Sequence, residues 1–186
     1  IVLDLGTGGG FSAMLFASRP DVVVHTFDIQ KTGSVDFILG NFPNVHFHLE
    51  NIRDMSDSLK ALFRSAHLIS VDISHDGFDE CVVMEDLKEL NVSAPVLWDD
   101  TFLNSGMIRC MKQLSSDPFF ATFDLSTIGH WTGTVLSVKA TEALCITCPK
   151  LPGVWNQVHF DDIRSHFLEE TNVDAEMYPI LQQAFS

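Results

Sequence analysis

Ile1-Val-Leu-Asp-Leu-Gly-Thr-Gly-Gly-Gly10, the first ten residues of the chain, decide the fold. Apolar residues of buried-strand character run straight into a glycine-rich turn, and the apolar, helix-compatible stretch 11–17 follows. A strand, a glycine turn and a helix in this order place backbone N–H groups and a helix N-terminus against a ligand. We expect glycines there because a Cβ would block close approach of the ligand. The alternative is a tight strand-to-helix turn that binds nothing.

The spacing of the glycines distinguishes between ligands. A dinucleotide-binding G-x-G-x-x-G pattern would need a third glycine at the position of Phe11. The chain instead reads Asp4-x-Gly6-x-Gly8-x-Gly10, which resembles the first motif of class I S-adenosylmethionine-dependent methyltransferases. The resemblance implies that these four residues form part of an S-adenosylmethionine site.

A second strand supports a nucleoside ligand. Residues 22–27 are mostly β-branched and apolar, and Asp28 follows them, 18 positions after Gly10. In doubly wound folds an acidic residue about 20 positions after the glycine loop binds a ribose hydroxyl pair. We therefore predict that Asp28 accepts hydrogen bonds from a ribose. The alternative is a solvated aspartate at a strand end.

Composition limits the classes of partner. A chain of 186 residues with 46% hydrophobic content is long enough for one domain with a substantial core. Its 11 basic and 25 acidic residues give a net charge of −14, which disfavours nucleic acid and anionic membrane surfaces as partners. No run of 18 consecutive apolar residues is present, so the sequence predicts no membrane span.

The start of the sequence and its cysteines bear on the cellular location of the protein. The chain opens inside a strand without a methionine, so we expect a segment upstream of Ile1. The four cysteines are few and scattered, which is typical of a reducing compartment and favours a cytoplasmic protein. Cys145 and Cys148 have a zinc or redox spacing, but no second pair exists and Pro149 follows directly. We interpret them as ordinary thiols.

Strand and helix patterns alternate along the chain. Further strands are predicted at 45–49, 67–71, 95–98, 119–124 and 134–138, and helices at 55–63, 78–90 and 104–114. These elements predict an α/β fold with a Rossmann-like, doubly wound, seven-stranded sheet. We expect the strand order 3-2-1-4-5-7-6 with the last pair antiparallel.

The seventh strand ends the expected methyltransferase domain, residues 1–140. Residues 141–186 are expected to form a helical extension, with a linker around Pro149 and Pro152 and helices at 158–169 and 179–185. This extension would cap the substrate pocket, contact a second subunit in a homo-oligomer, or pack on the sheet.

Three aspartates fall at the ends of neighbouring predicted strands. Asp72 follows the fourth strand, and Asp99 and Asp100 follow the fifth. In open α/β sheets the reactive crevice lies beyond the carboxyl ends of the strands. Converging carboxylates repel one another unless a cation compensates, and their hard oxygens suit Mg²⁺, Mn²⁺ or Ca²⁺. We therefore predict a divalent metal site. The alternative is that these aspartates cap loops and helices.

His75 follows Asp72 by three residues, in the turn Val71-Asp72-Ile-Ser-His75-Asp76-Gly77. An imidazole titrates near neutrality and can take a proton from a hydroxyl nucleophile. We predict that His75 is a general base. The alternatives are a fourth metal ligand and a surface residue without a role.

The pattern Asp72-x-x-His75-Asp76-Gly77, followed by Trp98-Asp99-Asp100, narrows the resemblance. It resembles metal-dependent small-molecule O-methyltransferases, in the branch of macrolide-sugar O-methyltransferases and cephalosporin-hydroxylase-like proteins. Ile73 and Ser74 depart from this branch, which often has Asp-Gly directly after strand four.

The resemblance covers about residues 1–140 and implies a role for each site residue. It implies a divalent cation, with Mg²⁺ favoured, and a catalytic imidazole. It also implies that S-adenosylmethionine is bound by the glycine loop and Asp28, with Glu50 after strand three and Asp72 after strand four beside it. The implied metal ligands are Asp72, Asp99 and Asp100, the base is His75, and the cofactor-binding residues are Asp4, Gly6, Gly8, Gly10, Asp28, Glu50, Asn51 and Asp72.

The predicted activity is methyl transfer to a hydroxyl group of a small molecule. A sugar, a polyketide hydroxyl and a catechol-like diol all suit such a site, and the loop Gly129-His130-Trp131 is either a pocket wall or a plain hairpin turn. Two other interpretations remain: an aminopropyltransferase with a similar glycine loop, and an inactive methyltransferase-like binding module. Cofactor binding with and without Mg²⁺ separates the three.

Overall fold

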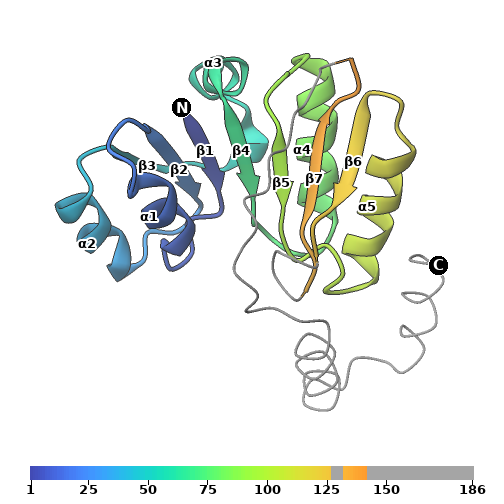
Figure 1. The fold of residues 1–186 in the computed structure, drawn as a ribbon. Helices are drawn as coiled ribbons and strands as arrows, with labels where there is room; N and C mark the ends of the chain where they lie inside the picture. Colours follow the sequence, from blue (N-terminus) through green and yellow to red (C-terminus); the bar gives the residue numbers. More distant parts are fainter. Residues whose placement is uncertain (127–131, 142–186) are drawn as a thin grey trace, which may run out of the picture.

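A computed structural model describes residues 1–126 and 132–141. The strands and helices alternate in the predicted manner (Figure 1). The strands are β1 (Val2–Leu5), β2 (Val24–Asp28), β3 (Val45–Leu49), β4 (Leu68–Val71), β5 (Val96–Trp98), β6 (Phe120–Asp124) and β7 (Val135–Lys139). The helices are α1 (Phe11–Ala17), α2 (Gly33–Asn41), the 3₁₀ turn η1 (Ile52–Asp54), α3 (Asp57–Ser65), α4 (Phe78–Glu89) and α5 (Ser105–Ser116).

The sheet has the predicted order, β3-β2-β1-β4-β5-β7-β6. The first five strands pair in parallel, and β7 pairs antiparallel with both β5 and β6. The predicted Rossmann-like class and the antiparallel final pair are therefore confirmed. This order brings the carboxyl ends of β1, β2, β4 and β5 to one edge of the sheet, where a doubly wound fold binds its ligand.

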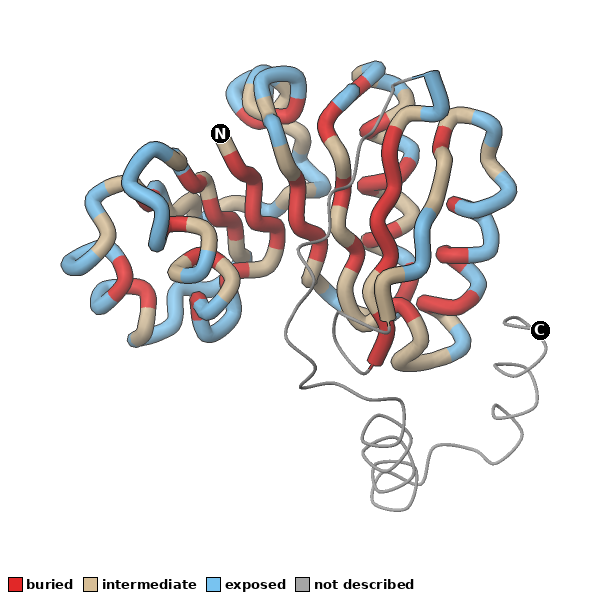
Figure 2. Tube along the Cα trace, in the orientation of Figure 1, coloured by how far each residue is buried: buried red, intermediate tan, exposed pale blue. Residues whose placement is uncertain are grey.

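Helices cover both faces of the sheet, and each face has its own core. On one face α1 and α2 pack against β1, β2 and β3 through Ala13, Ala17 and Ile38. On the other face α3, α4 and α5 pack around Phe63, Leu87 and Trp98 and related residues in a larger core. Burial runs along the middle strands in Figure 2. The central strands are buried on both sides and mostly apolar, with the polar side chains of Asp4 in β1 and Ser70 in β4 as exceptions.

One helix was not predicted. Helix α2 spans Gly33–Asn41, between the second and third strands, where the sequence analysis predicted no helix. Its two glycines lower the intrinsic helix propensity, and it buries only Val35 and Ile38. Packing against β3 and α1, rather than intrinsic propensity, therefore makes this segment helical. The other predicted boundaries agree with the structure within two residues.

Several predictions lie outside the described residues. They are the loop Gly129–Trp131, the pair Cys145 and Cys148, and the helical extension at 141–186, of which only residue 141 is described. Among the helices of the described ranges, none combines the length and apolar character needed to cross a membrane.

Candidate active site

A pocket of about 580 Å³ lies at the carboxyl ends of the strands. Its volume is in the range of small-molecule and cofactor sites. The lining comes from the glycine loop, the ends of β2 and β3, and the loops after β4 and β5. Of the predicted site residues, it includes Gly6, Gly8, Gly10, Asp28, Glu50, Asn51, Asp72, His75 and Asp99.

The three motif glycines all have positive φ, but for different structural reasons. A Cβ on Gly6 would lie 1.7 Å from the backbone oxygen of Asp72, and one on Gly10 would lie 1.9 Å from Ile38 Cδ1. These two glycines allow the chain to pack against itself. A Cβ on Gly8 would meet nothing within 4 Å, so only this position leaves its space to the pocket. All three line the pocket, and Gly8 is the one of the three at which a Cβ would enter open space.

Asp28 is fixed at the pocket edge by two backbone donors. The N–H of Gly8 donates to Oδ2 and the N–H of Gln30 donates to Oδ1, both at 2.9 Å. Each carboxylate oxygen can accept more than one hydrogen bond, so the pair can also accept from two vicinal hydroxyls. The bond to Gly8 also couples the acid to the glycine loop.

Asp4 lies beneath the glycine loop and is fully buried. Thr26 Oγ1 donates to Asp4 Oδ2 at 2.7 Å, and the Thr7 and Thr26 hydroxyls are also 2.7 Å apart. Burial raises the pKa of the Asp4 carboxyl from 3.8 to about 6, against the lowering effect of the Thr26 hydrogen bond. Asp4 does not line the pocket, and its hydrogen bonds support the loop from below.

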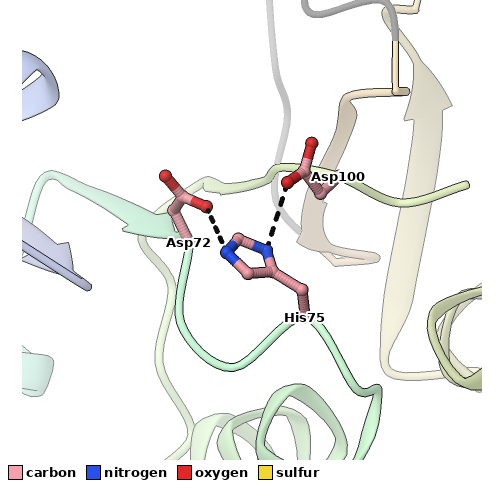
Figure 3. A group of neighbouring side chains, drawn as sticks. All are labelled: Asp72, His75 and Asp100. Carbon is pink, nitrogen blue, oxygen red and sulfur yellow. Dashed lines mark ion pairs between the residues drawn. The ribbon is translucent and has the colours of Figure 1, made fainter. Parts of the chain in front are cut away.

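His75 lies between two carboxylates (Figure 3). Its Nε2 is 3.5 Å from Asp72 Oδ1, and its Nδ1 is 3.2 Å from Asp100 Oδ2. Nδ1 is buried, and among the described residues it has this ion-pair partner but no aligned hydrogen bond. One ligand atom of each of the three residues lies within 4.8 Å of the others. The structure thus brings together two predicted metal ligands and the predicted base.

The two loops that carry this group are held in unusual backbone conformations. His75 has φ 56° and Asp100 has φ 53°, in the left-handed region that non-glycine residues seldom occupy. Such conformations cost about 1–3 kcal/mol and persist where the surroundings impose them.

Asp99 is on the pocket wall rather than in the Asp72–His75–Asp100 group. The hydroxyl of Thr134 donates to Asp99 Oδ1 at 3.2 Å, and the hydroxyl of Thr132 donates to Asp100 Oδ1. The segment that leads into β7 therefore orients both acids. Asp100 does not line the pocket and lies next to His75.

Glu80 and Asn104 support the His75 loop, and the sequence analysis missed both. Glu80 is buried, and its carboxylate accepts from the backbone N–H groups of His75 and Gly77, both at 2.9 Å. Asn104 caps α5 and donates to the His75 carbonyl at 2.5 Å. The available sequence signal was a glutamate three residues after Gly77, at the third position of the following helix.

The other two predicted cofactor residues line the pocket beyond β3. Ser56 donates to Glu50 Oε1 at 2.6 Å, and the Asn51 side chain caps the η1 turn by accepting from Arg53 N at 3.1 Å. Both are thus fixed near the position where the resemblance expects an adenine ring.

Comparisons with known proteins give a structural answer only. No protein-family profile matches the chain, and no curated protein matches its sequence. Solved structures do match. An O-methyltransferase from Bacillus cereus in complex with S-adenosylhomocysteine has TM-score 0.56 at 18% identity, covering 74% of this chain and 73% of that one.

Two further structures show the breadth of the fold. MycE, a methyltransferase of the mycinamycin biosynthetic pathway in complex with Mg and S-adenosylhomocysteine, has TM-score 0.54 at 14% identity, covering 81% of this chain and 47% of MycE. An rRNA methylase from Streptococcus thermophilus has TM-score 0.52 at 10% identity, covering 74% and 85%. The chain therefore has the fold of class I S-adenosylmethionine-dependent methyltransferases.

Proposed function

We propose that the protein is an S-adenosylmethionine-dependent methyltransferase that methylates a hydroxyl group of a small molecule with the help of a divalent cation. The observation that carries the proposal is the Asp72–His75–Asp100 group at the edge of a pocket built on a glycine loop. A nucleoside site and an acid–imidazole site are adjacent, as a transfer reaction between cofactor and acceptor requires.

The pocket fits S-adenosylmethionine in three respects. Gly8 leaves open space, Asp28 presents two anchored oxygens for a ribose, and Glu50 and Asn51 lie beyond them for the base. The acidic surroundings also suit a cofactor that carries a sulfonium and an ammonium group.

The donor set fits a hard divalent cation. We propose Asp72, Asp99 and Asp100 as its ligands, because carboxylate oxygens are what Mg²⁺ and Mn²⁺ prefer. Asp72 and Asp100 already converge on one point, and Asp99 lies on the adjoining pocket wall. A cation would also relieve the repulsion between the carboxylates.

The proposed mechanism assigns one role to each part. When bound, S-adenosylmethionine supplies an electrophilic methyl group, and a divalent cation lowers the pKa of an acceptor hydroxyl. His75 takes the hydroxyl proton on Nε2, the nitrogen farther from its facing carboxylate, while Asp100 faces the buried Nδ1 and stabilises the imidazolium. Glu80 and Asn104 hold the His75 backbone during this step.

A small-molecule acceptor agrees best with the charge of the chain. A net charge of −14 repels phosphate-rich acceptors, although the fold also occurs in an rRNA methylase. MycE, with Mg and S-adenosylhomocysteine bound, has the combination of ligands that we propose here.

The test is transfer of a labelled methyl group to a panel of hydroxylated small molecules and, in parallel, to RNA. We expect product from a small molecule with Mg²⁺ and none with EDTA. His75→Ala should lower kcat by roughly 10²–10⁴-fold with little change in cofactor affinity. Asp100→Asn should remove most activity, and Asp21→Asn, in the exposed α1–β2 loop, is the matched control. Full activity in EDTA or in Asp100→Asn would overturn the metal assignment, and transfer to RNA alone would overturn the acceptor class.

A further inference from the structure

A second cluster of metal-binding side chains lies outside the pocket. His46 and His48 alternate along β3, and His25 stands on the neighbouring strand β2. His25 is in register with His46, so the three side chains point to the same face of the sheet. We call His25, His46 and His48 the histidine cluster.

The imidazoles of the cluster are in contact. His25 Nδ1 lies 2.9 Å from His48 Nε2. The rings of His25 and His46 are stacked with centroids 4.9 Å apart, and those of His25 and His48 are 5.2 Å apart. Three imidazoles on two adjacent strands, two of them spaced i, i+2, are a ligand set that zinc uses in proteins.

We propose that the histidine cluster binds a transition-metal ion of the Zn²⁺ class, separately from the acidic site that we assign to Mg²⁺. Nitrogens of two ligands on one tetrahedral zinc ion lie about 3.3 Å apart, given zinc–nitrogen distances of about 2.0–2.1 Å. The His25–His48 pair therefore needs to open by only a few tenths of an ångström. The ligand nitrogens of the three histidines do not all lie within 4.8 Å of one another, so metal binding requires the exposed side chain of His46 to turn toward the His25–His48 pair.

The chemistry of the cluster selects against Mg²⁺. Imidazole nitrogens suit Zn²⁺, Cu²⁺ and Ni²⁺, whereas Mg²⁺ prefers oxygen. Burial lowers the pKa of His25 to about 4 and also lowers the pKa of His48, so both rings are neutral at pH 7 with a lone pair for a metal. The cluster offers three ligands, which leaves a fourth tetrahedral position for water.

The location of the cluster gives the ion a structural role. His48 stacks on Phe27 with ring centroids 4.5 Å apart, and Phe27 lines the cofactor pocket. Among the described strands, β3 is at the edge of the sheet and pairs with β2 on one side only. A metal bonded to both strands would link this edge to its neighbour beside the pocket and stabilise the folded state by mass action.

The test is Zn²⁺ titration by calorimetry, with Co²⁺ absorption as a report of ligand type, on Asp100→Asn protein so that the acidic site is disabled. We expect one Zn²⁺ per chain, a raised Tm, and a tetrahedral Co²⁺ spectrum without a thiolate charge-transfer band. His46→Gln and His48→Gln should each weaken Zn²⁺ binding at least about tenfold, or about 1.4 kcal/mol.

The matched control is His67→Gln, which removes an exposed imidazole outside the cluster and should leave Zn²⁺ affinity unchanged. His46 is exposed on the edge strand, so its variant is expected to fold even if changes at His25 destabilise the sheet. Equal Zn²⁺ affinity in wild-type and His46→Gln proteins would overturn the proposal. So would a thiolate band that shows cysteine ligands. Neither result bears on methyl transfer, which is tested separately.

Discussion

The buried carboxyl of Asp4 makes a quantitative prediction about stability. Its pKa rises from 3.8 to about 6, chiefly through burial. Since one pKa unit corresponds to about 1.4 kcal/mol, ionised Asp4 costs the folded protein about 3 kcal/mol at pH 7. The folded state holds the proton more tightly than the unfolded chain. The stabilisation that protonated Asp4 gives the folded state is therefore complete below pH 3.8, and it is lost as the pH rises to 6.

Asp4→Asn removes this titration. The difference in free energy of unfolding between variant and wild type should shift by about 2 kcal/mol in favour of the variant between pH 4.5 and pH 7. Urea denaturation of both proteins at the two pH values measures it, and all other titrating groups cancel in the comparison. A variant whose stability runs parallel to wild type across this range would refute the reasoning. S-adenosylmethionine should stabilise Asp4→Asn less than it stabilises the wild type, because the variant lacks the buried negative charge that attracts this cationic ligand.

Two further changes test how the site is held. Glu80 accepts hydrogen bonds from two backbone N–H groups, and Glu80→Gln would place an amide donor against one of them. The variant should therefore lower the free energy of unfolding by about 1–3 kcal/mol, measured by urea denaturation. It should also weaken Mn²⁺ binding near His75. Unchanged Mn²⁺ affinity would remove Glu80 as a positioning residue. Gly6→Ala places a Cβ on the Asp72 carbonyl and should destabilise by roughly 2–4 kcal/mol, whereas Gly8→Ala meets open space and should cost about 1–2 kcal/mol. Equal losses from the two glycine variants would show that the packing difference is unimportant.

The sequence was sufficient for the fold because its strongest local signals agree with one another. A glycine loop after an apolar strand, an acid after the second strand and regular alternation of elements predict the strand order that the structure has. Helix α2 was missed because its glycines and short apolar stretch give weak periodicity, and only its packing makes it helical.

The site could be predicted only in part. Strand-end position predicted that Asp72 and Asp100 would meet near His75, which the structure shows. It could not predict the left-handed backbone at His75 and Asp100, nor the buried Glu80 that supports the loop, because these depend on contacts between distant segments. The structural reason for Gly6 could not be predicted either, since its neighbour is the backbone carbonyl of Asp72, just after β4, rather than a ligand.

The proposed function requires that the pocket bind S-adenosylmethionine. Calorimetric titration of the intact protein with S-adenosylhomocysteine tests it most directly, because it requires neither the acceptor nor the metal. We predict one site per chain, at least about tenfold weaker in Asp28→Ala and unchanged in Asp36→Ala, an exposed control on α2. Absence of binding by the intact protein, or equal binding by Asp28→Ala, would contradict the account.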